Sequence, residues 1–227
     1  MRFVLLLLPT IAAFAPGRKP SSHSTALSET AWSPVRFVQQ SSKFIPMPFT
    51  QAPRQVVTPG TTLWEPTSKA FQFAPLDDVV MGGVSSSGFR KGGVWSGRVT
   101  DENNGGFIGI RNTPYVQWDM AGCKGIELKV SSTTPGRFKM GLRDSTEFNG
   151  IVWNASFDVG RRSQTIRIPF AKLRATKFAG TVDGQVFDSS NVVGIQLIYS
   201  KFEYDGALNP NFRVGDVNLQ IESIRAY

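Results

Sequence analysis

From Leu63 onward, apolar and polar residues alternate with a period of two, a pattern typical of β-strands that bury one face. Residues 125–131 show it clearly, with aliphatic side chains on one face and charged side chains on the other. Turn-forming Gly, Pro, Asn and Asp residues separate such stretches. After a first apolar stretch at Trp64 and 71–73, we expect strands at 94–99, 107–111, 125–131, 138–143, 151–157, 166–168, 192–200 and 217–224.

Two stretches depart from simple alternation. Residues 192–200 are almost continuously apolar, as expected of a strand covered on both faces. Near the C-terminus the apolar positions slip by one residue before Ile224, which predicts a β-bulge near Ser223. About eight to ten strands, with one helical turn expected at 168–173, predict an all-β fold, an antiparallel two-sheet sandwich with no membrane span.

The first 60 residues have a different composition. A basic start and a short apolar stretch that ends in small residues predict a signal peptide at 1–13. Residues 14–60 are rich in Ser, Thr, Pro and basic residues, which is typical of a transit peptide. The junction at Phe14 resembles the bipartite presequence of algae with secondary plastids and implies plastid import. The alternatives are a secretory signal with a disordered linker, or a mitochondrial address. Residues 61–227 are expected to form one domain.

The distribution of charge and the types of reactive side chain present limit the classes of function that are possible. Residues 1–60 carry six of the 25 basic residues and one of the 17 acidic ones, so most of the net charge of +8 lies there. The remaining domain is mildly basic, which gives little reason to expect nucleic-acid binding. Cys123 is the single cysteine, and His23 is the single histidine and lies before the domain. The domain therefore lacks the residues for a Ser-His-Asp triad or a His- or Cys-rich metal site, and we expect neither catalysis nor a cofactor.

Two polar stretches with paired glycines, 77–86 and 102–107, lie between the expected strands. Glycine permits a positive φ or the close approach of another chain segment. The adjacent Asp77 and Asp78 are suited to accepting hydrogen bonds from nearby backbone N–H groups, whereas on an extended strand they point to opposite faces and cannot share one substrate. We interpret these stretches as a rigid polar corner, structural or partner-binding, formed by Asp77, Asp78, Met81, Gly82, Gly83, Ser85, Asn103, Gly105, Gly106 and Arg111.

The same residues carry a resemblance to a known family. The segments 77–85 and 102–107, followed by Arg111, are similar to the signature of the complex I intermediate-associated protein 30 family, with further support at 167–170, 194–197 and 219–224. The resemblance covers roughly 63–227. It implies a galactose-binding-like jelly roll that acts as an assembly factor. The chain departs from the family at 162–164 and 215–217, where members often carry Trp and Phe.

Several other residues are candidate binding groups. Arg137, Lys139 and Arg143 alternate along one expected strand and so share a face, either as a basic strip for RNA phosphates or as its solvated side. Residues 101–104 offer oxygens to a hard cation such as calcium, or form a solvated turn. The aromatic residues Phe148, Trp153 and Tyr199 have a role in stacking on a sugar or a partner, or in the core, and core packing is favoured for Trp153.

These observations leave four hypotheses. The leading one is an assembly factor that binds protein subunits of a membrane complex, or other assembly factors, in the plastid. The second is a sugar-binding module, which requires exposed coplanar aromatic side chains. An RNA-binding factor depends on the basic strip. An enzyme ranks last, because the sequence has no Gly-x-Gly-x-x-Gly stretch after a strand and no histidine in the domain.

Overall fold

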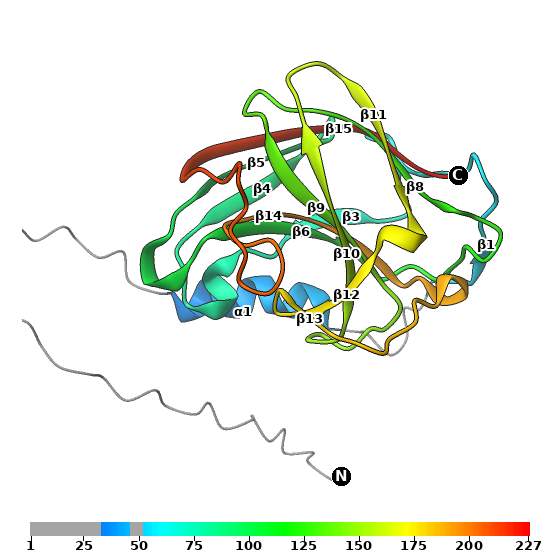
Figure 1. The fold of residues 1–227 in the computed structure, drawn as a ribbon, viewed down its shortest axis with the longest axis horizontal. Helices are drawn as coiled ribbons and strands as arrows, with labels where there is room; N and C mark the ends of the chain where they lie inside the picture. The colour runs from blue at the N-terminus through cyan, green and yellow to red at the C-terminus, as the bar shows by residue number, and fades with distance from the viewer. Residues whose placement is uncertain (1–32, 46–51) are drawn as a thin grey trace, which may run out of the picture.

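The computed structural model describes residues 33–45 and 52–227, which form a two-layered β-sandwich (Figure 1). One layer is a sheet of seven strands in the order β13-β12-β10-β9-β14-β6-β3. These strands are Gly180–Thr181 (β13), Arg174–Lys177 (β12), Val152–Val159 (β10), Gly136–Arg143 (β9), Gly194–Ser200 (β14), Phe107–Thr113 (β6) and Gln72–Pro75 (β3). The predicted signal peptide and the junction at Phe14 lie outside the described residues.

The second layer has six strands. Its path is β11-β8-β15-β5-β4, and β2 also pairs with β15. The strands are Gln164–Pro169 (β11), Gly125–Ser131 (β8), Gly215–Ala226 (β15), Val94–Val99 (β5), Ser86–Arg90 (β4) and Thr62–Trp64 (β2). Pairing within both large sheets is antiparallel, while a small separate pair, β1 (Gln55–Val56) and β7 (Trp118–Asp119), is parallel. The predicted antiparallel sandwich is confirmed.

The core lies between the two sheets, where alternate side chains of each strand meet. Trp95 of β5 and Phe138 of β9 face each other across it, with ring centroids 6.1 Å apart, and both are fully buried. The predicted bulge is present, because the pairing of β15 with β8 shifts between Ile221 and Ser223. The central strand β14 is buried over most of its length, as its continuous apolar sequence predicted.

A short helix precedes the sandwich and packs against it. The helix α1 (Pro34–Ser41) begins with Ser33, whose hydroxyl accepts from the N–H of Arg36 at 3.3 Å, and continues into the 3-10 turn η1 (Ser42–Phe44). It contacts the 3-10 turn η2 (Asp78–Met81). Packed structure therefore begins before the predicted domain boundary at residue 60, although processing of residues 14–60 stays a prediction. None of the helices in the described ranges is long and apolar enough to cross a membrane.

Trp95→Ala is expected to lower the free energy of unfolding by about 3–5 kcal/mol, because it leaves a large cavity between the sheets. Urea denaturation followed by circular dichroism measures the change. Trp95→Phe keeps a ring against Phe138 and should cost clearly less, and Val186→Ala, at a site that is 87% exposed, should cost almost nothing. Equal losses for Trp95→Ala and Val186→Ala would contradict this core assignment.

Candidate functional site

The polar corner is a buried cluster of hydrogen bonds at one side of the sandwich. The carboxylate of Asp78 accepts from the backbone N–H of Ser85 at 2.9 Å, from its hydroxyl at 2.6 Å, and from the N–H groups of Gly106 at 2.8 Å and Phe107 at 3.3 Å. Ser85 precedes β4 of one sheet and Phe107 begins β6 of the other, so one side chain joins the two sheets.

Asp77 repeats this arrangement one residue earlier. Its carboxylate accepts from the N–H and hydroxyl of Ser87 in β4, at 2.8 and 2.6 Å, and from the N–H of Gly109 in β6 at 3.3 Å. Gln40 of α1 donates to the same carboxylate at 3.1 Å and accepts from the Asp77 N–H at 2.8 Å. Burial raises the pKa of Asp77 above its ordinary value, and the donated hydrogen bonds, led by Ser87, act in the opposite direction.

The paired glycines allow the backbone to close on Asp78. A Cβ on Gly83 would lie 2.4 Å from the Asp78 carboxyl group, and one on Gly105 would lie 2.6 Å from its Oδ2 atom. Their neighbours Gly82 and Gly106 have φ values of 100° and 130°, which side chains rarely tolerate. Each pair therefore combines one residue for close approach with one for a left-handed turn.

This arrangement confirms the capping interpretation and limits the corner's role as a surface. Asp77, Asp78 and Ser85 are buried almost completely, so they stabilise the fold and are not available to a partner. Met81, at the end of η2, is 64% exposed, and Asn103 is exposed in the turn η3 (Glu102–Asn104).

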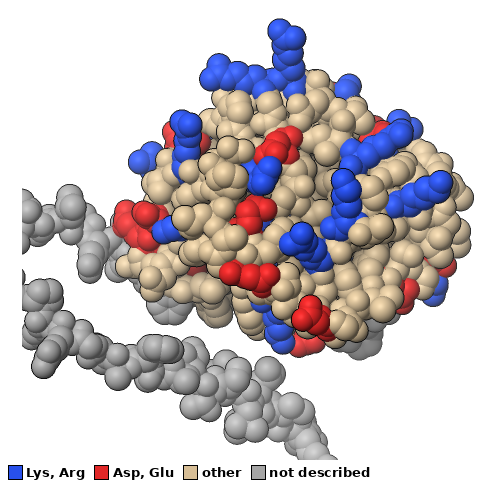
Figure 2. Space-filling view, in the orientation of Figure 1, with Lys and Arg blue, Asp and Glu red and all other residues tan. Residues whose placement is uncertain are grey.

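The prediction that β9 carries an exposed basic strip is wrong. Arg137, Lys139 and Arg143 do share the outer face of the strand, but Lys139 and Arg143 are 5% and 0% exposed, and Arg137 pairs with Asp158 at 2.7 Å. Loops and the N-terminal segment cover this face, which the strand alternation could not reveal. Figure 2 shows side chains of both signs on one face of the molecule. The RNA hypothesis loses the strip on which it depended.

Instead, the outer face of the seven-stranded sheet carries an internal polar network. Lys139 donates to the carbonyl groups of Phe202 and Glu203 at 2.6 and 2.5 Å. Ser156, beside Lys139 in the sheet, donates to the Glu203 carboxylate. Burial lowers the pKa of Lys139 to about 8, and the charge of Glu203 raises it in part.

A second part of the network lies toward β6. Arg111, another residue of the predicted corner, donates from Nε to Gln196 at 3.0 Å and is 4% exposed. On the opposite side of β9, Asn154 of β10 donates to Thr176 of β12 at 2.7 Å. Gln40, Gln196, Asn154 and Glu203 were not predicted as site residues. A signal was available for Gln40 alone, in the Ser33-Pro34 step, a typical helix start.

The remaining candidates have ordinary surroundings. Trp153, Tyr199 and Cys123 are buried, as expected for Trp153, and the Cys123 thiol donates to the Val57 carbonyl at 3.3 Å. Asp101 lies 3.9 Å from Lys201 in an exposed turn. Within the part of the chain that the structure describes, no group of three or more His, Cys, Asp or Glu residues is placed to hold a metal ion.

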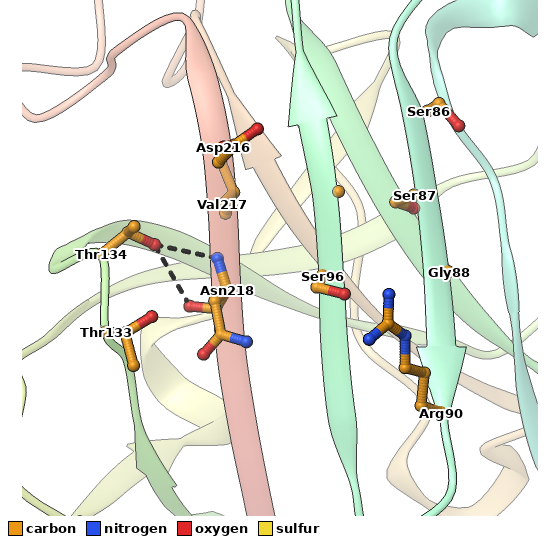
Figure 3. Close-up of a pocket in the computed structure, with 11 residues that line it drawn as sticks. Ser86, Ser87, Gly88, Arg90, Ser96, Thr133, Thr134, Asp216, Val217 and Asn218 are labelled. Atoms are coloured by element: carbon orange, nitrogen blue, oxygen red, sulfur yellow. Dashed lines mark hydrogen bonds between the residues drawn. The ribbon is translucent and has the colours of Figure 1, made fainter.

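A polar groove of about 480 Å³ lies on the outer side of the six-stranded sheet (Figure 3). Arg90 of β4 points toward Ser96 of β5, and Thr134 accepts from the Asn218 N–H at 2.8 Å. The lining residues are Ser86, Ser87, Gly88, Arg90, Ser96, Gly97, Thr133, Thr134, Asp216, Val217 and Asn218. This set has hydroxyl groups but no aromatic side chain, so it lacks the stacking surface that the sugar-binding hypothesis requires.

Comparison with known proteins shows which family this sequence matches and which solved structures have a similar fold. A model of the family described as "Complex I intermediate-associated protein 30" matches residues 63–221. A family 11 carbohydrate-binding module from Clostridium thermocellum, solved with a β-1,3-1,4-mixed-linked tetrasaccharide, aligns with 74% of this chain and 96% of its own, at 16% identity and a TM-score of 0.50. Another structure of a family 11 module, from a cellulosomal cellulase of the same organism, covers 74% and 95% at 14% identity and a TM-score of 0.43. A search of curated proteins gives no significant match. At 16% identity the likeness to the first of these modules shows the sandwich fold alone.

Asp78→Ala should lower the free energy of unfolding by roughly 3–6 kcal/mol, because it leaves three backbone N–H groups without their acceptor and removes one of the two acceptors of the Ser85 hydroxyl. Thermal and urea denaturation measure the loss. Asp183→Ala removes an exposed carboxylate and serves as the control. A loss for Asp78→Ala no larger than that of the control would show that the corner does not hold the sheets together.

Lys139→Met should flatten the pH dependence of stability above pH 8. The folded protein releases this proton near pH 8, whereas the unfolded chain holds it until about 10.5. Between these values the unfolded state binds more protons, so the free energy of unfolding of the natural protein rises with pH, by up to roughly 3 kcal/mol. Below this window both states are charged and the cost of burying the ammonium is fully present.

Urea denaturation across this pH window measures the slope for the natural protein and the variant. Lys177→Met, at an exposed position, is the control and should retain the rise. Parallel curves for the natural protein and Lys139→Met would contradict the assignment.

Proposed function

Because the chain belongs to the complex I intermediate-associated protein 30 family, we propose that it is a non-enzymatic assembly factor that binds unassembled subunits or other assembly factors of a membrane electron-transfer complex. The family match over residues 63–221 carries this proposal. It runs from β2 to the bulge of β15 and so includes the buried corner and both large sheets.

The exposed apolar side chains offer a contact surface for a protein partner. Phe178, Phe202 and Leu208 are 67%, 41% and 65% exposed. They belong to two loops joined by a hydrogen bond from the Asp205 N–H to the Ala179 carbonyl at 3.1 Å, and Phe202 and Leu208 form an isolated bridge. Apolar side chains on loops held in place lose little entropy when they are buried by a partner. We call Phe178, Phe202 and Leu208 the apolar rim.

The cellular site we propose is the plastid, where the client is a photosystem or a NADH dehydrogenase-type complex. The composition of residues 1–60 and the junction at Phe14 support plastid import, with the mitochondrion as the alternative. A fluorescent protein fused after residue 60 and expressed in an alga with secondary plastids tests this address. Fluorescence in the plastid supports it, while a secreted or mitochondrial reporter would refute it.

Affinity purification of the tagged protein from organelle membranes tests the function. We expect subunits of a membrane electron-transfer complex, or its assembly factors, and a loss of about tenfold or more in their recovery with Phe178→Ser combined with Leu208→Ser. Val186→Ser changes an exposed apolar residue outside the rim loops and should leave recovery unchanged. Recovery of soluble metabolic enzymes alone would contradict the assembly role, and full recovery with the double variant would exclude the rim.

A further inference from the structure

Two arginine side chains lie close together under the loops that cover the outer face of the seven-stranded sheet. Arg111 of β6 and Arg143 of β9 flank β14, opposite Gln196 and Gly194 respectively, and are 4% and 0% exposed. Gly194 lacks a side chain, and the stem of Arg143 passes 3.6 Å from where its Cβ would be. The sheet thus places two guanidinium groups on strands either side of β14, away from water.

Three nitrogen atoms of these groups have no hydrogen-bond acceptor. Arg111 donates from Nε to Gln196, while its Nη1 atom is buried and unpartnered. Arg143 donates from Nη2 to the carbonyl of Glu147, while its Nε and Nη1 atoms are buried and unpartnered. A buried charged donor without an acceptor is costly, and native proteins rarely leave one unexplained.

The acidic residues near Arg143, Asp144 and Glu147, compensate its charge only in part. Among the described residues, neither arginine forms a salt bridge. Asp144 follows Arg143 in the sequence. Its carboxylate accepts hydrogen bonds from the Trp153 Nε1–H at 2.8 Å and from the Asp188 N–H at 3.3 Å. Two like charges therefore share a dry site, which favours an anion between them.

The pKa directions agree with this geometry. Burial lowers the pKa of Arg111 to about 10, and the charge of Arg143 is the second cause. Burial likewise lowers the pKa of Arg143, and the charges of Tyr115, Asp144 and Glu147 raise it in part. An anion bound to both groups would offset both causes, because it favours their charged forms.

Aromatic side chains form the walls of the site. The rings of Phe44 and Phe148 lie 5.2 and 5.7 Å from the Arg111 guanidinium carbon. The Tyr115 hydroxyl lies 3.0 Å from the Phe44 carbonyl and 3.3 Å from the Thr146 carbonyl, within donating distance of both, which links η1 to the loop between β9 and β10. These contacts cover the Arg111 guanidinium and make η1 part of the cover of the arginine pair.

We propose that Arg111 and Arg143 form a binding site for a small oxyanion, a carboxylate or a phosphate group. Planar guanidinium groups match the paired oxygens of these anions through parallel N–H···O bonds. The inference rests on the arginine pair and its cover, and it does not depend on the proposed assembly function.

The full-length protein, labelled with ¹⁵N, is titrated with sodium phosphate and separately with sodium acetate, each against sodium chloride at equal ionic strength. We expect saturable shifts of the Arg111 and Arg143 Nε–H signals and a melting temperature that rises with oxyanion concentration beyond the chloride control. A response to phosphate alone or to acetate alone names the oxyanion. No response to either beyond chloride overturns the proposal, since water then occupies the site.

Two variants, Arg111→Met and Arg143→Met, test whether these residues bind the oxyanion. Each should weaken oxyanion binding by about tenfold or more, because one of two charged partners is lost. Without oxyanion each should melt no lower than the natural protein, since an uncompensated buried charge is removed. Arg162→Met, at an exposed turn, is the matched control and should bind normally. Unchanged binding in both pair variants would place the anion elsewhere and overturn the proposal. If either variant does not fold, the Arg111 and Arg143 Nε–H signals of the natural protein alone decide whether the site binds an oxyanion.

Discussion

The carboxylates of Asp77 and Asp78 hold the two sheets together at one open side of the sandwich. Between them they accept from backbone N–H groups before and within β4 and in β6, and from the hydroxyls of Ser85 and Ser87. Edge strands present unpaired backbone groups, which need partners once they are buried. Two adjacent acidic side chains meet that need here, and the four surrounding glycines exist because the backbone must close around them.

The outer face of the seven-stranded sheet shows a second consequence of covering a sheet with loops. Its side chains are polar, as a solvated face would require, yet Lys139, Arg143 and Arg111 are internal. Charged groups in such a place depend on specific partners, because their surroundings are poorly polarizable. Lys139 has two carbonyl acceptors, whereas the two arginines retain unpartnered nitrogens. The covering segments thus change the chemistry of residues that the strand pattern assigns to water.

The sequence pattern predicted the sandwich because the strands that build its centre alternate regularly or are continuously apolar. It also predicted the bulge at Ser223, since a slip in alternation has one structural meaning. The sequence pattern did not predict β4, because its Ser- and Gly-rich sequence is typical of a turn. It also did not predict α1, which lies in a stretch of transit-peptide composition. The role of Asp78 was predictable from local turn chemistry. The burial of Lys139 and Arg143 was not, because it is decided by loops distant in sequence.

The position of β15 in its sheet affects how the chain acquires its structure. This strand contains residues 215–226, yet it lies between β8 and β5 and also pairs with β2. The second layer closes only when this strand pairs with segments that are distant in the sequence, and such non-local pairing slows folding. Until then the backbone N–H and C=O groups along the facing edges of β5 and β8 lack partners, and such open edges can pair with other chains and cause aggregation.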